Sequence, residues 1–342
     1  MKRLYEKMLE AMERGENVVL CRIVASSGSA PRGAGACMAV FADGSTTGTI
    51  GGGAVERLAI AQAMEVQKSR TPVCRGFCLS PDQTADIGMI CGGDVTVYFR
   101  LFDAADESAR QLLLQTRRAL SGGKSCWRIT RLEEGCVTGE GLYDEENGLR
   151  FLDGLPMERL RPMLTGRALF VKGTPAFSVE PICRAGTVYL FGGGHVGKEL
   201  VPLLAGTEFQ VCVFDDRERF AKPENYPQAE RVIFGSFLKI GEKLEITKDD
   251  YVVIMTPGHL ADRQVLLQAL RTDAAYIGCI GSKTKAAKTN EFLLENGISA
   301  QELSRIHCPI GIEIYGDSPA EIAVSVAAEL IRHRAILSGA GG

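Results

Sequence analysis

The residues with the clearest chemical pattern form a glycine fingerprint past the middle of the chain. An apolar run over residues 188–191 leads directly into a G-x-G-x-x-G pattern over residues 192–197, and a second apolar run over 210–214 ends in two acids. This order predicts a strand, a tight glycine turn, a helix whose amino end can hold a pyrophosphate, and a second strand whose acidic tip meets a ribose hydroxyl. The predicted nucleotide-binding residues are Gly192, Gly194, His195, Gly197, Asp215 and Asp216.

A second histidine of interest closes the segment Thr256–His259, which follows a later apolar run. Loops at the carboxyl ends of parallel strands line the ligand crevice of such folds. His259 could act as a general acid or base, contact a dinucleotide, or cap a helix. The sequence leaves these three roles open, whereas His195 is expected to contact phosphate or cap its helix.

Two loops in the first half have the composition of an anion site. Residues 28–33 place Arg32 among small residues, and residues 48–53 run into a helix that carries Glu56. Glycines before a helix let a ligand approach backbone N–H groups closely, and the helix dipole favours an anion there. Arg32 could pair with the same anion bidentately. The alternative is a pair of tight turns with a solvated Arg32. The glycines concerned are Gly51, Gly52 and Gly53.

A third loop in the first half, residues 88–94, places Cys91 between glycines that include Gly92 and Gly93. A thiol in such a loop can react or contact a soft metal. By contrast, Cys212 and Cys279 interrupt apolar strand patterns and are expected only to pack. The predicted catalytic residues are Cys91, Glu56 and His259, and no spacing in the chain predicts a resident metal site.

These residues need a scaffold, and the patterning predicts an α/β protein with an α+β domain followed by a Rossmann-like, doubly wound parallel sheet. The predicted domains are residues 1–180 and 187–342. Expected strands in the first are 18–25, 36–41, 73–79 and 95–102, with helices at 1–16, 54–67 and 105–120 and short strand patterns over 126–179. Expected strands in the second are 187–191, 210–214, 231–234, 251–255 and 275–280, with helices at 261–271, 283–296 and from an N-cap at Ser318 to Ile336.

Composition excludes several functional classes. The chain has 342 residues and a formal net charge of -3, so it has no basic footprint and nucleic acid is not an expected partner. No apolar run approaches the roughly 18 residues of a membrane span, so no membrane association is expected. The charged amino terminus lacks the apolar core of a signal peptide, which favours a cytoplasmic protein.

Taken together, the motifs resemble those of the XdhC/CoxI family. The resemblance spans nearly the whole chain and is weakest over residues 126–179. It is carried by residues 28–32, 48–56, 88–93, 190–197, 215–217, 256–259, 276–283 and 309–329.

This resemblance implies an accessory protein for the maturation of molybdenum hydroxylases such as xanthine dehydrogenase. Such a protein would bind molybdenum cofactor (molybdopterin), support its sulfuration together with a cysteine desulfurase, and deliver it to the hydroxylase apo-enzyme. The resemblance makes Arg32, Gly51–Gly53 and Cys91, with its neighbours Gly92 and Gly93, the cofactor-handling set. Whether two copies form a homodimer is left open.

Two other functions are compatible with the sequence. In an NAD-dependent oxidoreductase, the glycine fingerprint and Asp215 would bind NAD and His259 would serve as acid or base. In a nucleotide-sensing regulator, the same residues would bind without chemistry. A dehydrogenase needs neither Cys91 nor the anion site around Arg32, so the first half of the chain discriminates between these functions.

Overall fold

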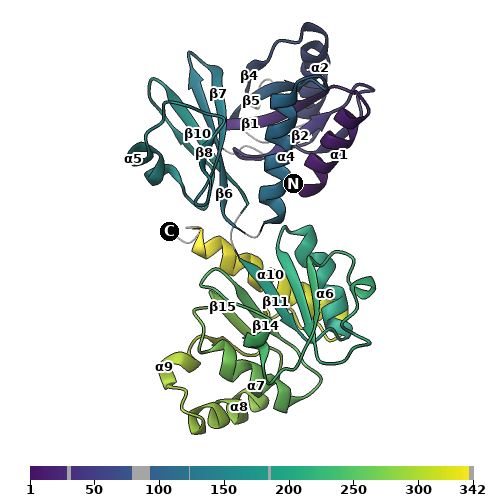
Figure 1. Cartoon of the computed structure of the whole chain (residues 1–342), viewed down its shortest axis with the longest axis vertical. Helices are drawn as coiled ribbons and strands as arrows, with labels where there is room; N and C mark the ends of the chain where they lie inside the picture. Colours follow the sequence, from purple (N-terminus) through teal and green to yellow (C-terminus); the bar gives the residue numbers. More distant parts are fainter. Residues whose placement is uncertain (29–31, 79–92, 123, 184–185, 339–342) are drawn as a thin grey trace. The chain divides into compact units, whose positions relative to one another are not determined.

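A computed structural model of the chain describes residues 1–28, 32–78, 93–122, 124–183 and 186–338 (Figure 1). The fold divides into two compact units, Met1–Arg184 and Ala185–Gly342. Among the described helices, none combines the length and apolar character that a bilayer span requires.

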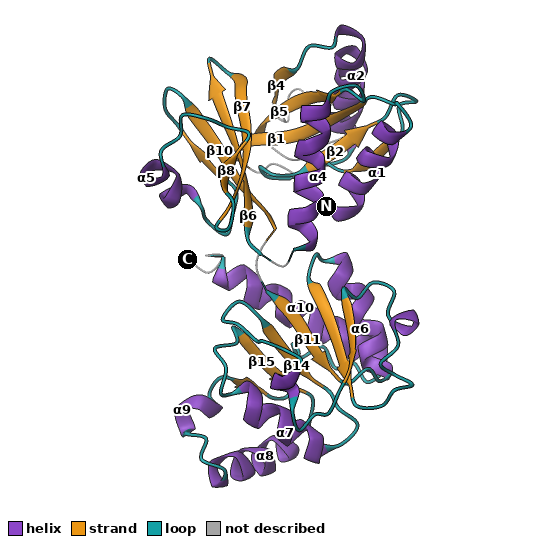
Figure 2. Cartoon of the chain, viewed as in Figure 1, coloured by secondary structure: helices purple, strands orange, loops and turns teal. Residues whose placement is uncertain are grey.

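The first unit contains an antiparallel sheet with strand order β3-β2-β1-β5-β4. Along β1, alternate residues face opposite sides: Val18 and Leu20 pack with α1 and α4, whereas Val19 and Cys21 pack with α2. Helices therefore cover both faces (Figure 2). The bounds are α1 Lys2–Glu13, β1 Val18–Gly28, β2 Cys37–Val40, β3 Thr46–Gly48, α2 Gly53–Ser69, β4 Val73–Cys78, β5 Gly93–Phe102 and α4 Glu107–Ser121.

A second antiparallel sheet of the same unit has the order β8-β7-β6-β10-β9, in the region where the sequence predicted only short strands. One face is apolar, with Ile129 and Val179 packed against Leu160. The other face carries buried polar groups, among them Thr130 and Glu180. The bounds are β6 Cys126–Glu133, β7 Cys136–Asp144, β8 Gly148–Arg150, α5 Met157–Leu160, η1 Arg161–Met163, β9 Leu169–Val171 and β10 Ala176–Cys183.

A buried charge network joins these two sheets. The guanidinium of Arg22, on β1, is 1% exposed and donates to Glu180 Oε1 (2.8 Å), to Thr130 Oγ1 (2.8 Å) and to Glu140. Arg100 of β5 also pairs with Glu140. Burial alone would raise the pKa of Glu140, but Arg22 and Arg100 outweigh it and lower that pKa to about 2. The two sheets of this unit are therefore held together by charges from both.

The second unit is a parallel six-stranded sheet with the order β13-β12-β11-β14-β15-β16. Helices α6 and α10 pack on one face, against Val188 and Leu190, and α7 and α8 pack on the other, against Tyr189 and Phe191. The predicted fold class is confirmed. The bounds are β11 Thr187–Phe191, α6 His195–Gly206, β12 Gln210–Asp215, η2 Pro223–Asn225, β13 Arg231–Phe234, η3 Ile240–Glu242, β14 Tyr251–Ile254, α7 His259–Ala269, β15 Tyr276–Cys279, α8 Lys283–Glu295, α9 Ala300–Leu303, β16 Ile306–His307 and α10 Pro319–Leu337.

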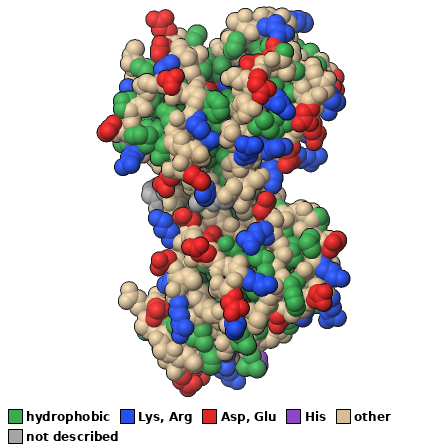
Figure 3. All heavy atoms as spheres, in the orientation of Figure 1, with side chains coloured by type: hydrophobic (Ala, Val, Ile, Leu, Met, Phe, Trp, Pro, Cys, Tyr) green, Lys and Arg blue, Asp and Glu red, His purple; other side chains and the backbone are tan. Residues whose placement is uncertain are grey.

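Charges are mixed on the molecular surface. On the face shown in Figure 3, acidic and basic side chains of the described residues are interspersed over each unit. Neither sign of charge forms a continuous patch on that face.

Candidate functional site

The strand order of the second unit creates a switch point between β11 and β14. From β11 the chain proceeds to β12 and β13 on one side, and β14, β15 and β16 then extend the sheet on the other side. Ligands of open α/β sheets bind beyond the carboxyl ends of the strands at such a point. Both strands are followed here by a glycine that caps a helix, Gly194 before α6 and Gly258 before α7.

The three fingerprint glycines have different structural roles. Gly192 has a φ of 108°, and a Cβ there would lie 2.3 Å from the carbonyl oxygen of Met255. A Cβ at Gly197 would lie 2.8 Å from the carbonyl oxygen of Gly192. A Cβ at Gly194 would meet nothing within 4 Å. The first and third glycines therefore permit close packing, and the middle one leaves the start of α6 open.

The starts of α6 and α7 have further common features. Neither helix has a side-chain hydrogen bond from its N-cap residue, and a Cβ at Gly258 would also meet open space. His195 and His259 are the first residues of these helices, and both are exposed. Helix-terminal N–H groups without side-chain caps, together with the helix dipole, attract anions. The structure thus brings the two predicted histidines to the same edge of the sheet, beside donors suited to an oxyanion.

Asp215, at the end of β12, stabilises the glycine turn by a hydrogen bond. Its carboxylate is fully buried and accepts from the N–H of Gly193 (2.7 Å) and from Arg217, whose Nε and Nη2 lie 2.8 and 2.7 Å from it. Burial would raise the pKa of Asp215, but the hydrogen bonds from Arg217 and Gly193 prevail and lower it. The hydroxyl of Tyr226 donates to the carbonyl of Gly193. A ribose hydroxyl would have to compete with Arg217 for Asp215, while the neighbouring Asp216 is exposed.

A buried acid that sequence reasoning missed shapes the loop before α7. Asp262 is 1% exposed and accepts from the N–H (3.1 Å) and the hydroxyl (2.6 Å) of Thr256. Its other oxygen pairs with Lys285 Nζ at 2.6 Å. These bonds fix the turn that presents His259. The sequence does contain a signal for this arrangement: Asp262 is the fourth residue of a helix, and the loop before that helix contains a threonine, Thr256.

The glycine loop of the first unit is capped from within. Glu56 Oε1 accepts from the N–H groups of Ile50 and Gly52, both at 3.1 Å, and from the hydroxyl of Thr49. Gly51, Gly52 and Gly53 all have positive φ, which lets the loop turn around this carboxylate. Glu56 is therefore a capping acid in this structure, and an external phosphate at the loop would have to displace it.

The remaining residues predicted in the first half are only partly described. Arg32 is exposed, as a ligand-binding or a solvated arginine would be. Gly93 begins β5 and pairs with Gly28 of β1. Cys91 and Gly92 lie outside the described residues. The assignment of these four residues to cofactor handling stays a prediction.

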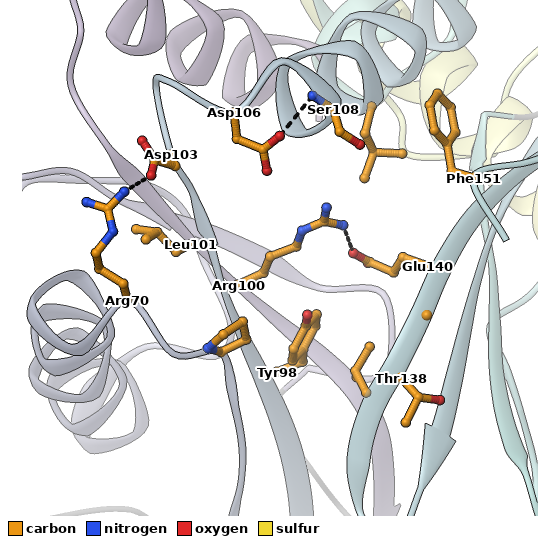
Figure 4. Close-up of a pocket in the computed structure, with 14 residues that line it drawn as sticks. Arg70, Tyr98, Arg100, Leu101, Asp103, Asp106, Ser108, Thr138, Glu140 and Phe151 are labelled. Carbon is orange, nitrogen blue, oxygen red and sulfur yellow. Dashed lines mark hydrogen bonds and ion pairs between the residues drawn. The ribbon is translucent and has the colours of Figure 1, made fainter.

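The first unit also has a polar pocket that the sequence did not predict (Figure 4). It has a volume of about 490 Å³ and is lined by residues of β5, α4 and β7. Its charges are largely paired: Arg70 with Asp103, and Arg100 with Glu140. Asp106, also in the lining, caps α4 through the N–H of Ser108. These pairings favour a structural role for the polar lining.

Comparisons with known proteins identify the class of both units. A family model described as the XdhC Rossmann domain matches residues 188–330, and one described as the XdhC and CoxI family matches residues 11–78. The second unit is thus a Rossmann domain of the XdhC type. The chain belongs to the XdhC/CoxI family.

Relatives with similar sequences cover most of the chain. A Bacillus subtilis (strain 168) protein named as a probable subunit of xanthine dehydrogenase is 27% identical over 96% of this chain and 97% of its own length. The molybdenum cofactor insertion chaperone PaoD of Escherichia coli (strain K12) is 26% identical over 94% of this chain and 85% of its own length. The uncharacterized protein YqeB of the same strain is 25% identical over 92% of this chain, which spans only 43% of YqeB.

A solved structure shows the same fold. A Bacillus halodurans protein crystallised as a xanthine dehydrogenase superimposes with a TM-score of 0.82, at 24% identity, over 99% of this chain and 98% of that chain.

Proposed function

We propose that this chain is an accessory protein that binds molybdenum cofactor and delivers it to the apo-enzyme of a molybdenum hydroxylase such as xanthine dehydrogenase. Membership of the XdhC/CoxI family supports this function, as do the names of its relatives in Bacillus subtilis and Escherichia coli. Support of cofactor sulfuration, with a cysteine desulfurase as partner, is part of the same proposal.

The observation that carries the proposal is the pair of open helix starts at the switch point. Molybdenum cofactor bears a phosphate, and its dinucleotide forms bear a pyrophosphate, so either form presents an oxyanion. Gly194 and Gly258 leave room for that oxyanion to reach the N–H groups of α6 and α7. The imidazoles of His195 and His259 would donate further hydrogen bonds to its oxygens. The bound cofactor would supply the molybdenum chemistry of the hydroxylase, and this chain's residues would hold and orient it.

The proposal also gives residues of the first unit a role in cofactor handling. Arg32 would supply a cation and Cys91 a thiol suited to a soft metal, whereas in the loop Gly51–Gly53 the N–H groups of Gly51 and Gly52 already donate to Thr49 and Glu56. Glu56 already occupies two of the loop's N–H groups, so we place the phosphate at the second unit. The role of Arg32 is then to pair with an exposed anionic group of the cofactor.

No specific observation favours the alternative of an NAD-dependent oxidoreductase. In that function the carboxylate of Asp215 would accept from a ribose hydroxyl. It is instead fully buried and bonded to Arg217 and Gly193. An exposed His259 at the start of a helix serves anion binding as well as proton transfer.

Retention of the cofactor by Gly194→Ala tests the proposal. Gly194 has φ −77° and ψ −162°, so alanine fits the backbone, and its methyl group would enter the space through which the oxyanion approaches. Protein purified from an anaerobic, molybdenum-competent host should carry pterin and molybdenum. We expect Gly194→Ala to reduce retention by about tenfold, the equivalent of losing roughly 1.4 kcal/mol of binding.

The matched control is Gly206→Ala, at the other end of α6, where a Cβ also meets nothing within 4 Å. It should retain the cofactor like the parent protein. Equal retention by Gly194→Ala and the parent would refute the phosphate site. A parent protein that carries NAD and no pterin would refute the proposed function itself.

A further inference from the structure

Two cysteines of the second unit lie at the ends of neighbouring strands: Cys279 is the last residue of β15, and Cys308 directly follows β16. The parallel register pairs Ile277 with Ile306 and Gly278 with His307, which makes Cys279 and Cys308 the next pair. Both side chains belong to the apolar cluster on the α7 and α8 side of the sheet. Neighbouring strands lie about 4.8 Å apart, within the Cα separation of about 4.4–6.8 Å that a disulfide can bridge.

The two thiols differ in their environment. Cys279 is 2% exposed, whereas Cys308 is only half-buried. The neighbouring thiol of Cys279 and, to a lesser extent, the ammonium of Lys285 lower the pKa of Cys308, against the effect of partial burial. The neighbouring thiol of Cys308, together with deeper burial, raises the pKa of Cys279. Cys308 is therefore the thiol that ionises first and that a reagent can reach.

Backbone and side-chain contacts fix Lys285 beside this pair. Its Nζ donates to Asp262 (2.6 Å) and to the carbonyl of Ile280 (3.3 Å). Its aliphatic stem and the sulfur of Cys308 both lie against Gly281, where a Cβ would be 3.0 Å from Lys285 Cδ and 3.6 Å from Cys308 Sγ. The aliphatic stem of Lys285 and the thiol of Cys308 thus share one side of a glycine that leaves room for both.

We propose that Cys308 and Cys279 form a thiol–disulfide exchange site that takes low-molecular-weight disulfides as its substrate. The thiolate of Cys308 attacks one sulfur of the disulfide, forms a mixed disulfide and releases one thiolate. Cys279 then loses its proton to solvent and attacks Cys308 Sγ, which forms the Cys279–Cys308 disulfide and releases the second thiolate. The protein loses two electrons and the small disulfide gains them. This chemistry is independent of the cofactor-binding function proposed above.

A second cysteine pair in the chain provides an internal comparison. Cys126 and Cys183 are register partners in the antiparallel pairing of β6 with β10. Burial, the first of several causes, raises the pKa of Cys126 to about 12. This pair has the proximity of Cys279 and Cys308, but Cys126 lacks the lowered thiol pKa of Cys308. It should therefore react far more slowly.

Peptide mapping by mass spectrometry, after the whole chain is incubated with oxidised glutathione, tests the proposal. The parent protein should yield a peptide cross-linked between Cys279 and Cys308. Cys279→Ser should instead retain one glutathione on Cys308, because the resolving thiol is missing. Cys308→Ser should leave Cys279 unmodified.

Rates of exchange at Cys308 test the role of the cation. We expect Lys285→Met to slow modification of Cys308 by about tenfold, the effect of roughly one pKa unit. Lys288→Met, an exposed lysine on the same helix, is the control and should leave the rate unchanged. A parent protein that stays fully reduced at both cysteines, or a Cys308 that reacts no faster than buried Cys212, would overturn the proposal whatever the variants do.

Discussion

Two glycine-rich loops, one in each unit, precede a helix, and they differ in whether an acid of that helix accepts hydrogen bonds from the N–H groups of the loop. In the loop before α2, Glu56 folds back and accepts from Ile50 and Gly52. In the loop before α6, the first turn of the helix contains no acid, and Gly194 faces open space. Glycines alone therefore do not define an anion site. The loops before α2 and α6 differ in whether an acid of the following helix already accepts from the loop.

The largest expected effect on stability comes from Gly192→Ala, which disrupts the glycine loop before α6. The added Cβ would lie 2.3 Å from the carbonyl oxygen of Met255, in a backbone conformation with φ 108°. Neither backbone segment can move without disturbing β11 or β14. We expect the free energy of unfolding of the second unit to fall by about 3 kcal/mol or more.

Urea denaturation measures this loss, with Gly194→Ala as the matched control. Gly194→Ala should stay within about 0.5 kcal/mol of the parent protein, because its methyl group meets nothing. Similar stabilities for the two variants would show that the glycines of this loop do not have separate roles.

An intermediate effect is expected from Glu56→Ala, which removes the internal cap of the other loop. Two backbone N–H groups and the hydroxyl of Thr49 lose their charged acceptor, so the free energy of unfolding of the first unit should fall by about 2 kcal/mol. Glu65→Ala, an exposed acid on the same helix, should cost less than about 0.5 kcal/mol.

Calorimetric titration of Glu56→Gln with inorganic phosphate sharpens the comparison. The amide oxygen of glutamine can still accept from the loop, so the cap is kept and its negative charge is removed. We expect no phosphate binding at this loop. If Glu56→Gln binds phosphate at the loop while the parent does not, the loops before α2 and α6 can both bind an anion, and they differ only because the charge of Glu56 occupies the first.

The smallest expected effect concerns the pH dependence of Asp215, which braces the open loop. Its folded-state pKa is lowered from an ordinary value of 3.8, so its stabilising contribution is present above that pH and is lost as the pH falls through the folded-state value. Unfolding free energies measured from about pH 5 down to about pH 3 should decline less steeply for Asp215→Asn than for the parent protein. Parallel slopes would show that the bonds to Arg217 and Gly193 do not stabilise the charged carboxylate.

The second unit was predictable because its signals are local. Apolar runs predicted β11 and β13 with the ends that the structure gives them. The N-cap predicted at Ser318 is confirmed, with Glu321 completing a capping box. The two-residue strand β16 was missed because Ile306 and His307 show no run or alternation.

The capping role of Glu56 was not predicted, because it depends on how the glycine loop turns around the carboxylate. The burial of Arg22 was not predicted, because its partners are distant in the sequence. Arg22 interrupts an apolar strand, and its acceptors Glu140 and Glu180 lie more than a hundred residues further along the chain. No local pattern shows which charges will meet. The hydroxyl of Thr49 donates to Glu56, and the hydroxyl of Thr256 likewise donates to Asp262. In both loops a threonine thus precedes the acid of the first helical turn to which it donates, and this order is visible in the sequence.

The buried arginine of β1 also decides how this protein can be recombined with its relatives. The family model of the first half ends at residue 78, which suggests a crossover point just beyond it. A chimera joined there would inherit Arg22 from one parent and the residues opposite it, at positions 140 and 180, from the other. If those residues were not acids, the buried guanidinium would lose its counter-charges at a cost of about 3–5 kcal/mol. Segment exchange in this family should therefore keep both sheets of the first unit from a single parent.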